Sequence, residues 1–400
     1  MCLSPRGDRH VNTAINDDGP HSRGGHRRVE IFVPVAGRRY AAGVTDVVES
    51  RMLRQHLWGQ PVASVDDVVR GFGAMQAQEF VPAKWSIAQR AADVTEADVD
   101  DAFAAGRLLR THVLRPTWHF VHPDDIGWIL RASAPRVHAA NAYYYRQTGL
   151  DDDAARRSRA VFERMLGEGA QLTRKELAAA LAGAGLPHTG VPLAYVIIRA
   201  ELDGVLISGA MRGKQHTYAL LDVRVPTRAT PDPDEALAEL TRRYFAGHGP
   251  ATVRDYCTWA SLTVAVARRG LDIVGGDMVS ETIDDRTYWS LPADRAPARK
   301  RPPNVPVIDL LQDYDEYVIG YFESRDVILA PGGPTNTLRA RLRPVMLDGR
   351  LAGYWRHTLT ASAVEIETVD VPDLTGARAA AMQAAADRFG AFLGRSARWR

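Results

Sequence analysis

Gln76 and Gln78 are the residues of this chain whose type and spacing could do chemistry. They lie within Met75–Glu79, which the apolar pattern places near the end of the second N-terminal helix. Two amides at the rim of a helix end could hold one water molecule between them. Arg115 and His119 follow at an expected strand turn and could face the same cleft. Because Gln-x-Gln occurs by chance in many helices, the amides could equally cap backbone groups.

Glu79 is the competing general base, because it is a carboxylate directly after Gln78. On a helix it points about 100° away from its neighbour. We therefore expect Glu79 to support the glutamines rather than to act on a substrate. Lys84 is the lysine near this element, and the sequence does not indicate a Schiff-base step.

Other kinds of site lack their signatures. There is no G-x-S-x-G or H-E-x-x-H motif, and the loop at 209–215 misses a Walker A motif because its glycine spacing is one residue short and Gln215 replaces the hydroxyl. Cys2 and Cys257 are too few for a disulfide framework or a cysteine-ligated cluster. A set of histidines and aspartates lacks metal-ligand spacing: His112, His119, His122, Asp124 and Asp125. We expect neither a metal nor an organic cofactor.

The charges are nearly balanced overall but not along the chain. Fifty basic residues face 48 acidic ones, for a net charge of +2, whereas residues 126–230 carry 14 basic and 9 acidic residues. Arginine supplies 46 of the 50 cations and suits phosphate and guanine edges, although a GC-rich genome also explains its abundance. No apolar run approaches about 18 residues, so we expect no membrane partner and a cytoplasmic protein.

The order of predicted elements repeats along the chain. Each repeat reads helix, capped helix, capped helix, hairpin, which is the winged-helix arrangement of a helix-turn-helix with a β-wing. We expect an α+β, mainly helical fold of tandem winged-helix units with a small β-rich C-terminal module. The expected parts are a disordered extension (1–45), a first unit with the Gln-x-Gln element (46–150), a second unit (151–230), a third unit (231–300) and the C-terminal module (301–400).

Local signals place the elements within each unit. Ser64, Thr95, Thr173, Thr252 and Thr263 are predicted to begin helices. Predicted hairpins turn around Arg115-Pro116, in the loop 209–216 and at Asp284-Asp285. Beyond a linker at 299–306, the expected C-terminal elements are strands at 307–311, 318–321, 345–347, 353–359 and 364–368 and a helix at 377–393.

The loop of the second hairpin is the best candidate for a wing tip. Arg212, Lys214 and Gln215 offer two cations and an amide on an exposed turn. Such side chains could contact a DNA phosphate or enter a minor groove, or they could simply be solvated.

These residues resemble the AlkZ-type DNA glycosylases, bacterial proteins of tandem winged helices, several of which protect producers of DNA-alkylating antibiotics. The likeness runs from about Ser50 to Leu393. The segments that carry it are Met75–Gln78, Leu109–Val121, Arg212–Leu221, Tyr244–Pro250, Asp315–Tyr321 and Trp355-Arg356. At 115–119 this chain reads Arg-Pro-Thr-Trp-His where the family usually has Arg-Gly-Thr-Leu-His, which implies a stiffer loop and a bulkier pocket wall.

The resemblance implies a monofunctional DNA glycosylase that hydrolyses the N-glycosidic bond of N7-alkylated guanine for repair or self-resistance. Bulky antibiotic adducts and interstrand cross-links are possible substrates. Gln76 and Gln78 would be catalytic, and the residues expected to contact DNA are Arg115, His119, Arg212, Lys214 and Gln215. The expected partner is duplex DNA carrying alkylated purines, bound by a monomer at the nucleoid. The alternative is a non-catalytic winged-helix transcriptional regulator.

Overall fold

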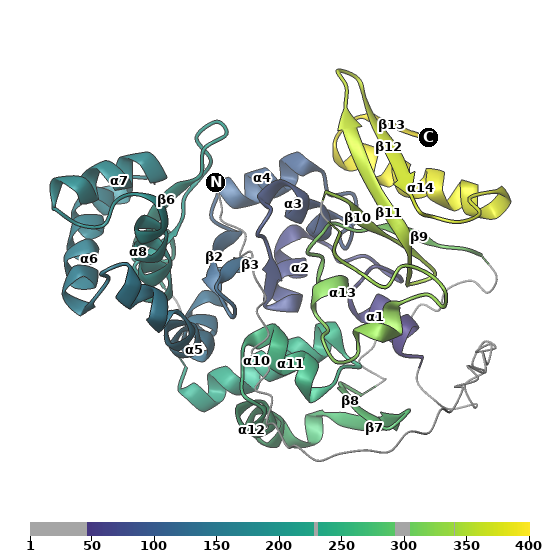
Figure 1. Cartoon of the computed structure of the whole chain (residues 1–400), viewed down its shortest axis with the longest axis horizontal. Coiled ribbons are helices and arrows are strands. Elements are labelled where there is room, and N and C mark those ends of the chain that lie inside the picture. Colours follow the sequence, from purple (N-terminus) through teal and green to yellow (C-terminus); the bar gives the residue numbers. More distant parts are fainter. Residues whose placement is uncertain (1–45, 228–230, 293–304, 340) are drawn as a thin grey trace, which may run out of the picture. The chain divides into compact units, whose positions relative to one another are not determined.

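The computed structural model describes residues 46–227, 231–292, 305–339 and 341–400 (Figure 1). The expected N-terminal extension and most of the expected linker lie outside the described residues. The described chain has a mixed α/β fold with several separate sheets. None of its described helices is long and apolar enough to cross a bilayer.

The first segment builds the sheet that carries Gln76. Its elements are α1 (Val47–Arg54), α2 (Val65–Phe72), β1 (Ala74–Gln76), α3 (Phe80–Ala88), α4 (Glu96–Ala104), β2 (Leu109–Val113), β3 (Thr117–Val121) and α5 (Ile126–Gln147). The strand order is β1-β3-β2, and both pairings are antiparallel. The Ser64 side chain caps α2, and Thr95 forms a capping box with Asp98 at the start of α4, so both predicted helix starts are confirmed.

The prediction that Met75–Glu79 belongs to a helix is wrong. Gly73 adopts a φ of 74° and ends α2, because this backbone conformation is open to glycine and rarely to other residues. The chain then pairs with β3 as an edge strand, with Gln76 opposite His119. Gln78 lies in the link to α3, whose N-cap is Glu79. The helical angle between Gln78 and Glu79 therefore does not apply.

The second and third segments show the expected order of three helices followed by a hairpin. The second contains α6 (Asp152–Leu166), η1 (Gly167–Gly169), β4 (Leu172–Thr173), α7 (Arg174–Gly183), α8 (Gly190–Leu202), β5 (Leu206–Ser208), β6 (Thr217–Leu220) and α9 (Leu221–Arg224). The third contains α10 (Pro233–His248), α11 (Val253–Ala260), α12 (Val264–Val274), η2 (Gly275–Asp277), β7 (Val279–Ile283) and β8 (Arg286–Ser290). Thr173, Thr252 and Thr263 cap their helices, and Asp284 and Asp285 turn the last hairpin with positive φ angles.

Helix α5 is an element that the sequence did not predict. Its buried positions include Ile129, Ser133, Val137, Asn141 and Tyr145, which follow each other at helical spacing. Two of these five side chains are polar, and Pro135 lies inside the helix, so the apolar period is interrupted.

The C-terminal segment forms one sheet of order β13-β12-β11-β10-β9, covered by α14. Its elements are β9 (Ile308–Leu310), α13 (Glu316–Ile319), η4 (Arg325–Ile328), β10 (Arg343–Leu347), β11 (Arg350–Leu359), β12 (Ala363–Val369), α14 (Gly376–Phe392) and β13 (Ser396–Trp399). The predicted strand at 318–321 is wrong, because Asp315 caps a short helix there by accepting from the Tyr317 amide. The other four predicted strands and the terminal helix are confirmed.

One hydrophobic core joins the first and third segments to Tyr321, which follows α13 by two residues. Leu109 and Val121 of the first sheet pack in the same cluster as Tyr244, Trp259 and Tyr321. This shared core brings the strand that carries Gln76 close to α10, α11 and α13.

Candidate active site

Gln76 and Gln78 lie at the end of the edge strand, against the turn between β2 and β3. Gln76 is 8% exposed, and Gln78 is half-buried. The backbone continues along β3 past Gln76, because the Ala77 amide donates to the carbonyl oxygen of Trp118 at 2.7 Å. Gln76 is thus held on the sheet, and Gln78 lies in the link that leads into α3.

Protein donors fix the orientation of both side-chain amides. Arg115 Nη2 donates to Gln76 Oε1 at 3.1 Å, and the Trp118 amide donates to Gln78 Oε1 at 3.3 Å. A guanidinium and a backbone N–H can only donate, so each glutamine must present its oxygen to them. A carbonyl oxygen has two lone pairs, and each amide oxygen can therefore accept one further hydrogen bond.

Arg115 and His119 lie beside Gln76, as the sequence suggested, but they contact protein groups. The guanidinium of Arg115 also donates to the Trp259 carbonyl at 2.8 Å and lies 3.3 Å from His119 Nε2. His119 is fully buried, and its Nδ1 lies 2.9 Å from the Thr117 carbonyl. In this structure both side chains support Gln76, and their contact with DNA stays a prediction.

Burial and charge keep the His119 ring neutral. Burial, followed by the neighbouring Arg115 charge, lowers the pKa of His119 to about 3. The neutral ring donates from Nδ1 to the Thr117 carbonyl, which leaves Nε2 free to accept from Arg115. Burial also lowers the pKa of Arg115, and the charge of Glu316 opposes this shift.

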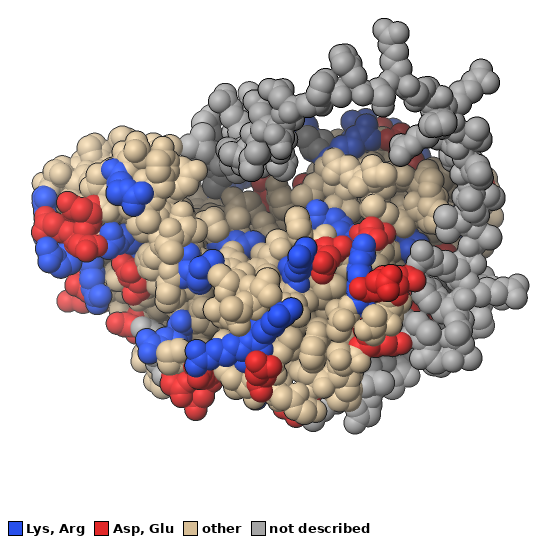
Figure 2. All heavy atoms as spheres, turned by 60° about the horizontal axis from the view of Figure 1, so that its bottom comes forward, with Lys and Arg blue, Asp and Glu red and all other residues tan. Residues whose placement is uncertain are grey.

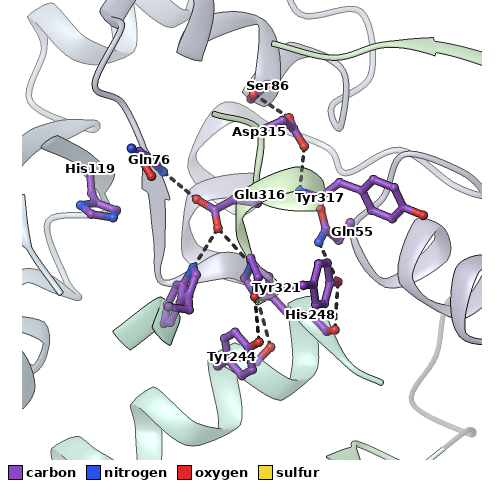
Figure 3. A network of polar contacts seen from close by, with 12 residues as sticks. Gln55, Gln76, Ser86, His119, Tyr244, His248, Asp315, Glu316, Tyr317 and Tyr321 are labelled. Carbon is purple, nitrogen blue, oxygen red and sulfur yellow. Dashed lines mark hydrogen bonds and ion pairs between the residues drawn. The ribbon is translucent and has the colours of Figure 1, made fainter. Parts of the chain in front are cut away.

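Glu316 is a site residue that the sequence did not identify (Figure 3). Its Oε1 accepts from the Gln76 backbone amide at 2.7 Å. Its Oε2 contacts His248 Nε2 at 3.1 Å and accepts from Trp259 Nε1 at 2.8 Å. Burial alone raises the pKa of Glu316, but the His248 hydrogen bond and charge, with Arg115 and the Gln76 amide, bring it to about 2. The carboxylate is therefore ionised.

Glu316 and His248 both lie in segments that carry the family resemblance. Glu316 lies in Asp315–Tyr321, and His248 lies in Tyr244–Pro250. Neither segment has a residue spacing that indicates chemistry by itself. Only folding shows that both meet under Gln76.

Arg110 holds the backbone on the Gln78 side of the site. Its Nε donates to the Ala77 carbonyl at 2.9 Å, and its Nη2 donates to the Gln78 carbonyl at 3.3 Å. The guanidinium also lies 4.1 Å from the Trp118 ring centroid, a cation–π contact. These contacts fix the link between β1 and α3.

The predicted wing tip lies next to this link. The His216 ring packs edge-on against Phe80 with centroids 4.9 Å apart, and Phe80 begins α3 two residues after Gln78. Arg212 forms an ion pair with Glu176 at 2.8 Å. Lys214 is exposed and forms no ion pair with another described residue.

Gln215 completes the turn, because its backbone pairs with that of Arg212, and its side chain is exposed. All three wing residues are therefore exposed, and the Arg212 guanidinium is paired with Glu176.

The two competing residues near the glutamines have other surroundings. Glu79 is exposed, and its charge acts on Asp313 and Arg343 in the C-terminal segment. Lys84 is buried, and its Nζ contacts Glu96 at 2.7 Å and Asp100 at 3.0 Å.

Comparisons with known proteins relate the chain to DNA glycosylases. The family described as DNA glycosylase AlkZ-like matches residues 69–392. The curated "Interstrand DNA cross-link repair glycosylase" of Streptomyces sahachiroi is 27% identical over 327 residues, which are 76% of this chain and 85% of the relative. The solved structure of Streptomyces sahachiroi DNA glycosylase AlkZ shares the fold, with a TM-score of 0.74 at 24% identity over 89% of this chain and 98% of that chain.

The match spans both glutamines and the residues around them. The chain is a DNA glycosylase, an enzyme of DNA repair. It belongs to the AlkZ-like DNA glycosylase family.

Proposed function

We propose that this enzyme hydrolyses the N-glycosidic bond of N7-alkylated guanine in duplex DNA and leaves an abasic site. Alkylation at N7 places a positive charge on the base, so the base departs without a general acid. The transition state is oxocarbenium-like at the sugar, as in glycoside hydrolysis. The protein then needs only to place a water molecule and to stabilise the developing cation.

Gln76 and Gln78 perform these two tasks in the proposal. Their oxygens carry partial negative charge and can accept hydrogen bonds from one water molecule, which turns a water lone pair toward the sugar carbon. The observation that carries the proposal is that donor-only groups, Arg115 and the Trp118 amide, already fix both amide oxygens. The two amides are therefore preorganised, unlike those of surface glutamines, which rotate freely.

The step ends at the abasic site because no amine is available for a lyase reaction at this element. Lys84 Nζ is buried between two carboxylates and follows the glutamines on the inner side of α3. A Schiff base requires a free, accessible amine. The proposed enzyme is therefore monofunctional.

DNA contact is proposed for three winged-helix units, 46–150, 151–230 and 231–300, with 301–400 as a separate β-rich module. Each unit contains helices followed by an antiparallel hairpin, which is the order of that motif. Figure 2 shows basic and acidic side chains interspersed on the face that it displays, so this face is not uniformly basic. Lys214 and Gln215 are the proposed wing contacts next to the site, and the enzyme acts as a monomer.

Bulky lesions are part of the proposed substrate range. The curated relative is described as acting on interstrand cross-links. A natural-product adduct or a cross-linked base is too large to swing into a tight base pocket. In this chain Pro116 and Trp118 replace the smaller residues usual in the family, so the range of accepted adducts is expected to differ.

The test measures base release from a duplex that carries one N7-methylguanine, under single-turnover conditions, followed by alkaline cleavage of abasic sites. Gln76→Ala and Gln78→Ala are each expected to slow release by about 10² to 10⁴. Glu79→Ala is the matched control, because this neighbouring side chain is exposed and faces the C-terminal segment. EDTA is expected to leave the rate unchanged.

Two results contradict the proposal. If Glu79→Ala loses base release while both glutamine variants stay active, the Glu79 carboxylate and not the glutamine pair is the catalytic group. If the wild-type enzyme releases another damaged base but no N7-alkylguanine, the proposed substrate is wrong.

A further inference from the structure

The backbone amide of Gln76 needs a partner from outside its sheet. β1 is an edge strand, and its amides alternate between facing β3 and facing away from it. Gln76 is nearly buried, so an amide without an acceptor would be costly. Glu316 Oε1 supplies the acceptor from α13, more than 200 residues away in the chain.

A set of buried donors holds this carboxylate in place (Figure 3). Trp259 Nε1 and His248 Nε2 both meet its second oxygen. His248 Nδ1 lies 3.2 Å from the Tyr244 carbonyl oxygen, so both ring nitrogens face oxygen atoms. The ring also stacks on Tyr244 at 4.7 Å between centroids.

Gln76 is therefore held at two points by groups of opposite charge. The Glu316 carboxylate binds its backbone, and the Arg115 guanidinium binds its side-chain oxygen. The two charges also act on each other, because Glu316 opposes the fall in the pKa of Arg115. Removing the carboxylate would release the strand end and remove the negative charge that acts on the Arg115 guanidinium.

We propose that Glu316 is a positioning residue for base excision, acting through Gln76 rather than on the substrate. This inference rests on the proposed role of Gln76 in holding the attacking water. Glu316 itself is fully buried beneath the strand. Its contribution is the placement of the Gln76 amide, where an error of about 1 Å can cost about 10²-fold in rate.

Asp315 offers a matched control on the same short helix. It is also fully buried and pairs with Arg90 through both oxygens, at 2.7 and 2.8 Å. It also accepts from Ser86 and from the Tyr317 amide, and its partners among the described residues include neither Gln76 nor Arg115. Asp315→Asn therefore reports the cost of disturbing a buried carboxylate without touching Gln76.

The experiment compares Glu316→Gln, Asp315→Asn, Gln76→Ala and the double variant Glu316→Gln/Gln76→Ala. Three quantities are measured for each: the single-turnover rate at saturating enzyme, the Kd for the lesion duplex, and the melting temperature. Glu316→Gln is expected to lose about 10- to 100-fold in rate with Kd within about twofold. Asp315→Asn is expected to lower the melting temperature and to keep the rate of the folded enzyme within about twofold.

The double variant separates positioning from a general loss of structure. If Glu316 acts through Gln76, the double variant loses little more than Gln76→Ala alone. Full additivity, or a wild-type rate in folded Glu316→Gln, would overturn the inference while leaving the glutamine site intact. A wild-type rate in Gln76→Ala would instead overturn the proposed function, and this inference with it.

A milder variant covers the case in which Glu316→Gln does not fold. Trp259→Phe keeps the aromatic packing and removes one donor to the carboxylate. It is expected to slow release by about 3- to 10-fold at unchanged Kd. An unchanged rate would contradict the inference.

Discussion

The Arg115 side chain could either bind DNA or position Gln76, and a substitution at this residue distinguishes these two roles. A DNA-binding arginine would contact a phosphate, whereas the structure shows its guanidinium on Gln76 Oε1, the Trp259 carbonyl and His119 Nε2. We predict that Arg115→Met slows base release at saturating enzyme and leaves DNA affinity nearly unchanged.

The magnitude follows from the lost contact with Gln76. A hydrogen bond from a charged donor contributes about 1.5–3 kcal/mol. If that contact holds the amide oxygen in its reactive orientation, its loss raises the barrier by a similar amount, or about 10- to 150-fold in rate. Arg115→Lys keeps a charge but not the planar fork, and we expect an intermediate loss.

The assay measures single-turnover release from an N7-methylguanine duplex together with the Kd for the same duplex across a range of salt concentrations. Arg156→Met is the control, because Arg156 lies on the exposed face of α6 in an ion pair with Asp153. Weaker binding with a salt slope reduced by about one and an unchanged rate at saturation would identify Arg115 as a phosphate contact. That result would refute the positioning argument.

Three further predictions concern the wing and two buried titratable groups. Removing Arg212 and Lys214 together should weaken duplex binding uniformly across sequences. Most of the change in the salt dependence of binding should come from Lys214, since Arg212 is paired with Glu176. Unchanged affinity in a filter-binding or polarisation assay would exclude the wing from the DNA-binding surface. The pKa of His119 is about 3 in the folded chain against 6.5 in the unfolded chain, so the unfolded chain binds an extra proton as pH falls below about 6.5. The free energy of unfolding should therefore fall by about 2 kcal/mol at pH 5. His119→Gln should remove this pH dependence in urea melts. Burial raises the pKa of Asp309 to about 6 from 3.8, so its contribution to the free energy of unfolding falls by about 2 kcal/mol from pH 4 to 7. Asp309→Asn should therefore have a higher melting temperature than the wild type at pH 7 but not at pH 4. An equal shift in melting temperature at both pH values would contradict this prediction.

Local sequence signals determined most helices and hairpins. Ser64, Thr95, Thr173, Thr252 and Thr263 begin helices where a side-chain oxygen meets the free amides of the first turn. These contacts span three residues, so the sequence contains them in full. The Gln-x-Gln pair and its nearness to Arg115 were also visible from residue types and the family resemblance.

Interactions between distant residues decided the remainder. Ala74–Gln76 forms an edge strand because β3 offers a pairing partner more than 40 residues later, which no local pattern reveals. Helix α5 was missed because its buried stripe contains Ser133 and Asn141, whose burial depends on neighbouring helices.

The chemical environment of the site was also decided by the tertiary structure. Gln76 receives its backbone partner from Glu316 and its side-chain partner from Arg115, and Glu316 in turn is held by His248 and Trp259. A hydrogen bond depends on distances of about 3 Å in space and not on separation along the chain. Residue types and the family resemblance therefore indicated the two glutamines, whereas the folded core, which joins the first, third and C-terminal segments, determined which way their amides point.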